Sequence, residues 1–303
     1  DIDPATFNLH PSHLEARITP RTKAILPVHL FGLAADMDAI NAIAQRHGLW
    51  LVEDAACGFG ARYHDQHVGT LGTTGCFSFH PRKAITTGEG GMITTQDANL
   101  ADKLRRLRDH GAAISDLQRH LGPRPYLLAD HTEAGYNLRM TDIQGALGSA
   151  QMDRAAAIIA ERQRLAAHYD RAFATLDWLA TPVRPAGYTH GYQSYPCLFQ
   201  PERARQAAAS RDTAAIKAIN ADRNAWMDQL QQQGVSTRPA THAVHMLSFY
   251  QQKYRLAPTD YPNAFAANDC SISLPLFHGM TSEEQERVID IVQNAEINQG
   301  TVQ

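Results

Sequence analysis

Short apolar runs and one amphipathic segment alternate in the first hundred residues. Four runs have the length and composition of buried β-strands: residues 23–28, 49–53, 76–80 and 91–95. Between the first two, residues 36–47 carry apolar side chains at helical spacing, with Asp36 as the N-cap and Gly48 as the stop. This alternation predicts an α/β sheet of parallel strands joined by right-handed crossovers.

The pattern continues with longer helices. Residues 97–110 predict the next helix, and a polar, proline-containing connection follows at 111–134. Thr141 is placed to cap a long helix that runs toward Leu176. We expect this helix, within residues 141–177, to connect two domains.

The second domain is expected to be smaller and of the α+β type. Residues 192–199 alternate as in a strand. Residues 206–233 are rich in Ala, Gln and charges and predict a helix, with an exposed first half and no packing partner. The predicted division is therefore 1–140 for the large domain, 141–177 for the connecting helix and 178–303 for the small domain.

The composition excludes several classes of protein. The chain has 303 residues, 44% of them hydrophobic, and a formal net charge of -3. It has no basic footprint for nucleic acid and no apolar run long enough to cross a membrane. The four cysteines are scattered without a C-x-x-C pair, which favours reduced thiols and a cytoplasmic enzyme. No metal is expected, because His242 and His245 lack a glutamate arranged as in zinc peptidases.

Three residues suggest cofactor chemistry. A lysine that forms a Schiff base with pyridoxal phosphate must be held at a strand end, with a carboxylate facing the pyridine nitrogen. Lys83 and Asp54 each follow a predicted strand, and the hydroxyl of Ser78 could donate to a phosphate oxygen. Alone, each residue is a weak signal, since most lysines are surface groups and an Asp after a strand is commonly a cap.

A longer series of motifs makes the pattern specific. It comprises residues 27–32 (PVHLFG), 36–40 (DMDAI), 52–61 (VEDAACGFGA), 77–79 (FSF), 88–91 (GEGG), 135–144 (GYNLRMTDIQ) and 273–276 (SLPL). In order and spacing they closely resemble the DegT/DnrJ/EryC1/StrS family of sugar aminotransferases. The resemblance covers nearly the whole chain.

The resemblance implies specific roles. Lys83 corresponds to the Schiff-base lysine, Asp54 to the carboxylate at the pyridine nitrogen, and Ser78 to a phosphate-binding hydroxyl. Asn137 matches an asparagine that reaches the cofactor phosphate of the neighbouring subunit, which implies a homodimer with shared active sites. Cys57 stands where the family usually has Gln or His beside the ring, so it lines the cofactor or is merely a small packed residue.

The resemblance also implies the fold. We expect the large domain of the pyridoxal-phosphate-dependent, aspartate-aminotransferase-like class (fold type I), followed by a smaller α+β C-terminal domain. Residues 1–8 resemble the middle of the family's large domain. The large domain is therefore expected to be N-terminally incomplete.

The implied reaction transfers an amino group from L-glutamate to a nucleotide-linked keto sugar. Residues 86–93 and 241–245 are similar to the perosamine-synthase-like branch, which acts on a 4-keto-6-deoxy sugar. Residues 234–239 resemble a strand near the sugar-nucleotide site, where Arg238 faces a diphosphate or is a structural surface residue. His242 and His245 are candidate substrate contacts.

Other readings remain open. A dehydratase branch of the same fold replaces the lysine with histidine, so Lys83 argues against it. The motifs do not separate amination at C4 from amination at C3 or of a cyclitol ketone. A catalytically incomplete cofactor-binding or regulatory relative is the alternative from another class.

Overall fold

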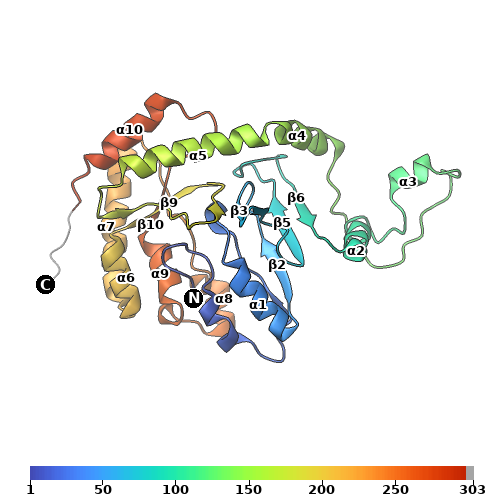
Figure 1. The fold of residues 1–303 in the computed structure, drawn as a ribbon, viewed down its shortest axis with the longest axis horizontal. Coiled ribbons are helices and arrows are strands. Elements are labelled where there is room, and N and C mark those ends of the chain that lie inside the picture. The colour runs from blue at the N-terminus through green and yellow to red at the C-terminus, as the bar shows by residue number, and fades with distance from the viewer. Residues whose placement is uncertain (298–303) are drawn as a thin grey trace.

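The structure is a computed structural model and describes residues 1–297 (Figure 1). Its α-helices are α1 Met37–His47, α2 Ala98–Arg108, α3 Asp116–Leu121, α4 Asp142–Asp153, α5 Ala155–Ala172, α6 Pro201–Ala209, α7 Thr213–Gln232, α8 Ser248–Tyr254, α9 Pro262–Cys270 and α10 Ser282–Gln293. Its strands are β1 Ala24–Ile25, β2 Trp50–Asp54, β3 Arg62–Tyr63, β4 Gln66–His67, β5 Thr74–Ser78, β6 Gly91–Thr94, β7 Leu179–Ala180, β8 Tyr188–Thr189, β9 Tyr195–Phe199 and β10 Ser271–Leu274.

The sheet that carries the candidate site has the strand order β1-β2-β5-β6. β1 pairs with β2, and β2 with β5, in parallel, as the alternating pattern predicts. β6 runs antiparallel to β5, so the prediction of a parallel strand at 91–95 is wrong. Residues 79–90 form a loop and not a crossover helix, and the Phe79 amide donates to the Gly90 carbonyl at 2.8 Å. The two strands therefore form a hairpin.

The predicted ends of α1 are confirmed. The Ala39 amide donates to Asp36 Oδ1 at 3.2 Å, and Gly48 takes the left-handed conformation with φ of 61°. The Asp36 side chain satisfies a free amide at the start of the helix, and Gly48 ends the helix because glycine tolerates positive φ. Ile40 and Ile43 face the sheet and join a buried cluster with Leu51 of β2. The helix predicted at 97–110 is likewise confirmed as α2.

The long helix predicted after Thr141 is two helices, and that part of the prediction is wrong. Thr141 caps α4 through a capping box with Gln144, as expected. At Arg154 the backbone N–H donates to the Gln151 carbonyl, three residues back, at 3.1 Å, which is 3-10 and not α-helical bonding. α5 then continues in nearly the same direction and ends at Ala172 (Figure 1).

The helix predicted at 206–233 is also two helices, and neither lacks a packing partner. α6 ends at Ala209, and Asp212 caps α7 by accepting from the Ala215 amide at 2.9 Å. α7 buries Ile216, Ile219 and Trp226, so the predicted exposed first half is wrong. The sequence signal for the break is Asp212 itself, a preferred N-cap residue.

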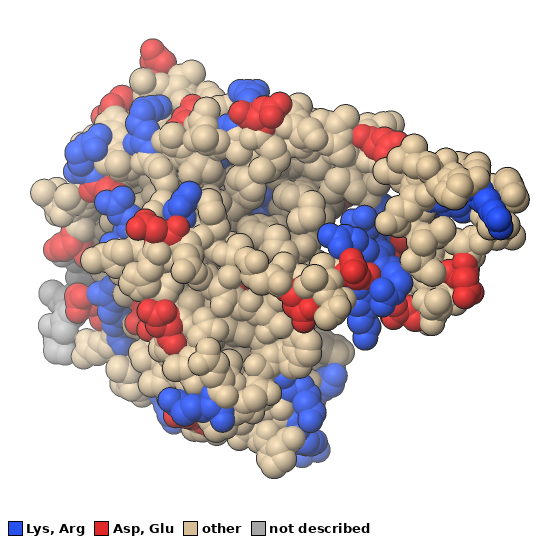
Figure 2. Space-filling view, turned by 45° about the vertical axis from the view of Figure 1, so that its right-hand side comes forward, with Lys and Arg blue, Asp and Glu red and all other residues tan. Residues whose placement is uncertain are grey.

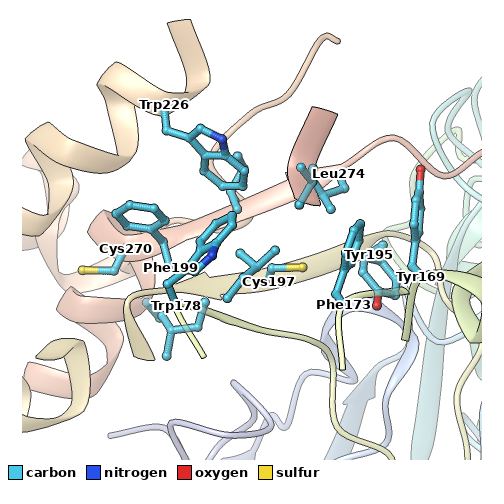
Figure 3. Close-up of a cluster of buried hydrophobic side chains, with 14 of the residues drawn as sticks. Tyr169, Phe173, Trp178, Tyr195, Cys197, Phe199, Trp226, Cys270 and Leu274 are labelled. Atoms are coloured by element: carbon cyan, nitrogen blue, oxygen red, sulfur yellow. The ribbon is translucent and has the colours of Figure 1, made fainter. Parts of the chain in front are cut away.

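A second sheet, β10-β9-β7, lies in the larger hydrophobic core. All five residues of β9 are buried, within the strand predicted at 192–199. In Figure 3, side chains from β9, β10, α5 and α7 converge, and the indoles of Trp178 and Trp226 meet edge to face at 5.0 Å. Aromatic rings bury large areas and favour such offset contacts. The thiols of Cys197 and Cys270 are buried and free.

A third sheet, β4-β3-β8, joins residues 62–67 to residues 188–189. It links the segments that the sequence assigns to the large and small domains. The long connection at residues 111–134 includes the short helix α3 and stands away from the rest of the molecule (Figure 1). Across residues 1–297, none of the helices combines the length and the apolar character needed to span a bilayer.

Basic side chains gather near the base of this projecting segment (Figure 2). The last turn of α2 carries Arg105, Arg106 and Arg108. Arg106 pairs with Glu133, and Arg139 pairs with Asp109, each at 2.7 Å. These ion pairs fasten the segment after α3 against α2.

Candidate active site

Two neighbouring parallel strands end at the same edge of the first sheet. Asp54 is the last residue of β2, and Ser78 is the last residue of β5. The register pairs Asp54 with Cys76, so Ser78 lies two residues further along the same edge. The carboxyl ends of parallel strands are where open α/β sheets bind ligands. The structure thus brings the predicted carboxylate and hydroxyl to one edge.

The side chains of Asp54 and Ser78 can each still bind a ligand. Asp54 Oδ1 accepts the Ala56 amide at 3.0 Å, while within residues 1–297 its Oδ2 has no hydrogen bond or ion pair. Ser78 Oγ accepts a long hydrogen bond from the His80 amide at 3.4 Å, which leaves the hydroxyl proton to donate. The pKa of the nearby Cys76 thiol is raised, first by burial and then by the charges of Asp54 and Glu53.

Lys83 lies in the loop between β5 and β6. Its Nζ is 3.1 Å from Cys57 Sγ, and its backbone N–H donates to the His80 carbonyl at 2.9 Å. The side chain is half-buried and lines a cavity of about 380 Å³. Sulfur accepts hydrogen bonds weakly, so the Cys57 contact leaves the amine able to react. The structure therefore places Cys57 beside Lys83.

The lysine loop is braced from α4. Gln144 Nε2 donates to the Glu89 carbonyl at 2.8 Å, and Gln151 Oε1 accepts the Thr86 amide at 3.4 Å. Gln144 is the last residue of the motif at 135–144 and Gln151 follows it in the same helix, but no role for either followed from sequence alone. Their contacts explain the motif, because the loop they hold carries Lys83.

Glu53 is a buried residue beside the site whose structural role the sequence reasoning missed. It is fully buried, and its oxygens accept the amides of Gly69, Leu71 and Gly72 at 2.6 to 2.7 Å. It also receives His29 Nε2 at 2.8 Å. Burial alone raises its pKa, but the hydrogen bonds from His29, Gly69 and Gly72 outweigh burial, so the pKa lies below the ordinary value. Glu53 therefore holds a turn against the strand that ends at Asp54.

The tautomer of His29 follows from its partners. Nδ1 accepts the Ala35 amide at 3.1 Å, so the ring proton is on Nε2 and is donated to Glu53. Gly69, which completes the cluster, has φ of 84°, a left-handed conformation that favours glycine. An added Cβ there would also collide with the Phe77 ring.

Arg238 lines the same cavity as Lys83, as do Ser273 and Arg162. The strand expected at 234–239 is reduced to a single bridge between Arg238 and Ser273, so that prediction is wrong. Pro239 has no N–H to donate, which ends the ladder at once. The side chain of Arg238 nonetheless reaches the cavity of the lysine.

The two predicted histidines lie elsewhere. His242, His245 and Tyr250 line a separate cavity of about 440 Å³, together with Leu26 and Val28 beside β1. His245 is 5% exposed, and its pKa is lowered by burial, while a hydrogen bond with the Pro258 backbone opposes that shift. Neither histidine lines the cavity that contains Lys83. Val28 bridges to Asp54, so the second cavity adjoins the strand that carries the carboxylate.

Asn137 lies outside both cavities. It is exposed on the segment that follows α3, where its backbone forms an antiparallel bridge with Asp109. Asn137 therefore lines neither the cavity of Lys83 nor the cavity of the two histidines. Ion pairs from α2 fix the backbone on either side of it.

These groups fit pyridoxal phosphate in part. An amine lines an open cavity, a carboxylate at the adjacent strand end has an unpartnered oxygen, and a hydroxyl at the same edge can donate. Across residues 1–297 no group of three or more metal-ligating side chains is present. The fold is that of a fold type I aminotransferase.

The sequence profile of the DegT/DnrJ/EryC1/StrS aminotransferase family matches residues 1–293, and the chain belongs to this family. GDP-perosamine synthase of Caulobacter vibrioides is 38% identical over 290 residues, which are 95% of this chain and 70% of that protein.

Solved structures agree with this assignment. The aminotransferase from Psychrobacter cryohalolentis superposes with a TM-score of 0.84 at 27% identity, covering 97% of this chain and 73% of that one. The putative sugar aminotransferase Spr1654 from Streptococcus pneumoniae, solved in its PLP form, has a TM-score of 0.81 at 23% identity and covers 96% and 72%. At that identity the second match supports the fold alone. The predicted family and fold class are confirmed.

Proposed function

We propose that this chain transfers an amino group from L-glutamate to a nucleotide-linked 4-keto-6-deoxy sugar, with pyridoxal 5'-phosphate as cofactor. The observation that carries the proposal is the contact of Lys83 Nζ with Cys57 Sγ at 3.1 Å, three residues after Asp54, whose second carboxylate oxygen has no partner within residues 1–297. The likeness to a GDP-perosamine synthase supports the sugar class.

Each residue has a distinct role in this proposal. Lys83 would hold the cofactor covalently, and its free amine would act as the general base that moves the proton from the donor carbon. Asp54 pairs with the protonated ring nitrogen and favours the charged forms of both groups. Ser78 donates to the phosphate, and Cys57 packs beside the ring. The cofactor supplies the electron sink that makes the donor proton acidic.

The proposal includes a homodimer with shared sites. Asn137 is exposed and lines neither cavity of its own chain, so it is available to reach the phosphate held by a second copy. We also propose a cytoplasmic location, because all four cysteines are free thiols and thiols persist in reducing compartments.

Amino transfer itself provides the test. The protein, loaded with pyridoxal phosphate, is expected to form 2-oxoglutarate from L-glutamate beyond one equivalent per site only when a nucleotide-linked 4-keto-6-deoxy sugar is present. Asp54→Asn should lower the rate about a hundredfold or more, since a positioned charge at the reacting group is lost. Asp65→Asn, an exposed change of the same type, should leave the rate unchanged.

Two results would contradict the proposal. Equal turnover by Asp54→Asn and the native chain would remove Asp54 from the mechanism. Turnover with a 3-keto sugar or a cyclitol ketone, but not with the 4-keto sugar, would reassign the acceptor within the family.

A further inference from the structure

The Lys83 amine and the Cys57 thiol lie in direct contact, with 3.1 Å between Nζ and Sγ. Among the hydrogen bonds of residues 1–297, no other joins a lysine to a cysteine. Two atoms that are about 3 to 3.5 Å apart and correctly aligned are already close to the geometry of reaction. The amine and the thiol can therefore react with each other without a large movement of the chain.

The backbone holds both side chains in place. Cys57 lies in a turn after β2, in which the Gly58 amide donates to the Ala55 carbonyl at 2.8 Å. An added Cβ at Gly58 would collide with the Val68 side chain, so the turn is closely packed. The loop that carries Lys83 is held by the hydrogen bonds from α4. Groups that are fixed near each other react as if each were present at a very high concentration.

The Lys83 amine has no competing partner. Within residues 1–297 its Nζ makes no ion pair, and the Cys57 thiol makes no second hydrogen bond. Lys217 shows the contrast, because its Nζ lies 2.8 Å from Asp269 Oδ2. A carboxylate at that distance favours the ammonium form, which has no electron pair with which to attack. The Lys83 amine is not held in this way.

The four thiols differ in how readily they can be oxidised. Burial raises the pKa of the Cys76 and Cys197 thiols, and raises that of Cys270 to about 12. A raised pKa disfavours the thiolate, which is the form that peroxide oxidises. Cys57 is half-buried and contacts Lys83, which lines an open cavity, so a small oxidant can reach it.

We propose that Cys57 and Lys83 form a reversible redox site, in which hydrogen peroxide joins the two side chains through a sulfur–nitrogen bond. Peroxide transfers one oxygen atom to the thiol, which gives a sulfenic acid and one water. The Lys83 nitrogen then attacks Sγ, the S–O bond breaks, and the hydroxyl group leaves as a second water with a proton from the amine. Sulfur is oxidised by two electrons, peroxide is reduced, and the chain loses two hydrogen atoms in total.

The link is reversible by thiols. Two equivalents of a thiol reductant restore the Cys57 thiol and the Lys83 amine and leave the reductant as its disulfide. An amine that is bonded to sulfur cannot attach a cofactor, so oxidation switches the site off. This consequence rests on the proposed function, whereas the link itself depends only on the contact between the two side chains. A cofactor already attached to Lys83 protects the amine from the link.

Peroxide treatment of the full chain tests the link. Cofactor-free and cofactor-loaded portions are treated with hydrogen peroxide, and their peptides are mapped without reductant. The cofactor-free chain should lose two hydrogen atoms and give a peptide pair joined at Cys57 and Lys83, which dithiothreitol separates. Loading with pyridoxal phosphate should lower the yield of this pair at least about tenfold, since the amine is occupied.

Matched variants locate the link. Cys57→Ser should abolish the joined pair. Cys76→Ser changes a half-buried cysteine of β5 in the same way and should leave the pair unchanged. A visible cofactor band that is weakened by peroxide and restored by dithiothreitol in the native chain, but is insensitive to peroxide in Cys57→Ser, is the expected second readout.

The outcomes separate the redox site from the reaction. A joined pair, together with covalent cofactor on another lysine, would retain the redox site and reject the role of Lys83 in the proposed function. Covalent cofactor on Lys83 with no joined pair after peroxide treatment would reject the redox site and retain the function. Oxidation of Cys57 that stops at added oxygen atoms, or a joined pair that persists in Cys57→Ser, would also overturn the redox site.

Discussion

Glu53 and Asp54 are consecutive carboxylates with opposite environments. Successive side chains of a strand point to opposite faces, so Glu53 is fully buried while Asp54 remains half-buried at the site. The sequence predicted Asp54, because a carboxylate that follows an apolar run is a local signal. It did not predict Glu53, because the partners of Glu53 come from residues 29 and 69–72, which only the fold brings together.

Glu53→Gln tests this buried cluster. The glutamine side chain keeps one acceptor oxygen, but its NH₂ group would face backbone N–H groups that also need an acceptor. The variant should therefore lose about 3 kcal/mol of unfolding free energy at pH 7. The pKa of Glu53 is lowered in the folded state, so its contribution is complete above the ordinary value of 4.5 and is lost as the pH falls through the lower folded value. Denaturant unfolding from pH 7 to pH 3 measures both effects.

The difference between the native chain and Glu53→Gln should therefore shrink below about pH 4.5. Glu283→Gln, an exposed change of the same type, should alter stability by less than about 0.5 kcal/mol at every pH. A buried cluster of no structural importance would show equal stability for all three proteins.

At the scale of elements, the sequence was reliable where the signal is local. The ends of α1 followed from Asp36 and Gly48, which act within one turn. The antiparallel direction of β6 could not be predicted, because direction depends on the absence of a crossover helix and on pairing with a distant strand. The break before α7 had a signal in Asp212, but the left-handed Arg211 at φ of 56° that makes the turn had none.

Helix α4 contacts the loop that carries Lys83. Gln144 closes the capping box with Thr141 and also donates to the Glu89 carbonyl of the lysine loop. Gln144→Ala should lower stability by about 1 kcal/mol and increase hydrogen exchange in residues 86–90, since the loop loses a fixed contact. Hydrogen exchange followed by mass spectrometry measures the loop directly.

Gln118→Ala is the matched control, because Gln118 closes the same kind of capping box on α3. It should leave the exchange of residues 86–90 as it is in the native chain. Unchanged exchange in Gln144→Ala as well would show that α4 does not brace the loop.

At the scale of the whole molecule, two features lay beyond the sequence. The motifs grouped Arg238, His242 and His245 together, yet the fold assigns them to two cavities, because residues near one another in the chain can face different surfaces. Asn137 was recognised as a motif residue, and its exposure outside both cavities leaves it available to the site of a second chain.

Mixing two inactive variants tests the shared site. Lys83→Ala and Asn137→Ala should each have little activity alone. If a dimer forms each site from both chains, random reassociation gives hybrids with one intact site, and activity should return to about a quarter of the native value. Light scattering checks that the mixture is dimeric, and no recovery in dimeric hybrids would mean that each chain builds its own site.

The most direct test of the account is covalent cofactor attachment. Pyridoxal phosphate is added to the purified chain, the visible absorbance is recorded before and after L-glutamate, and the cofactor is fixed with borohydride for peptide mapping. We predict a band that L-glutamate bleaches and a label on Lys83, with none on the other lysines, Lys23, Lys103, Lys217 and Lys253. A label on any of those four, or no label at all on the chain, would contradict the assignment of Lys83.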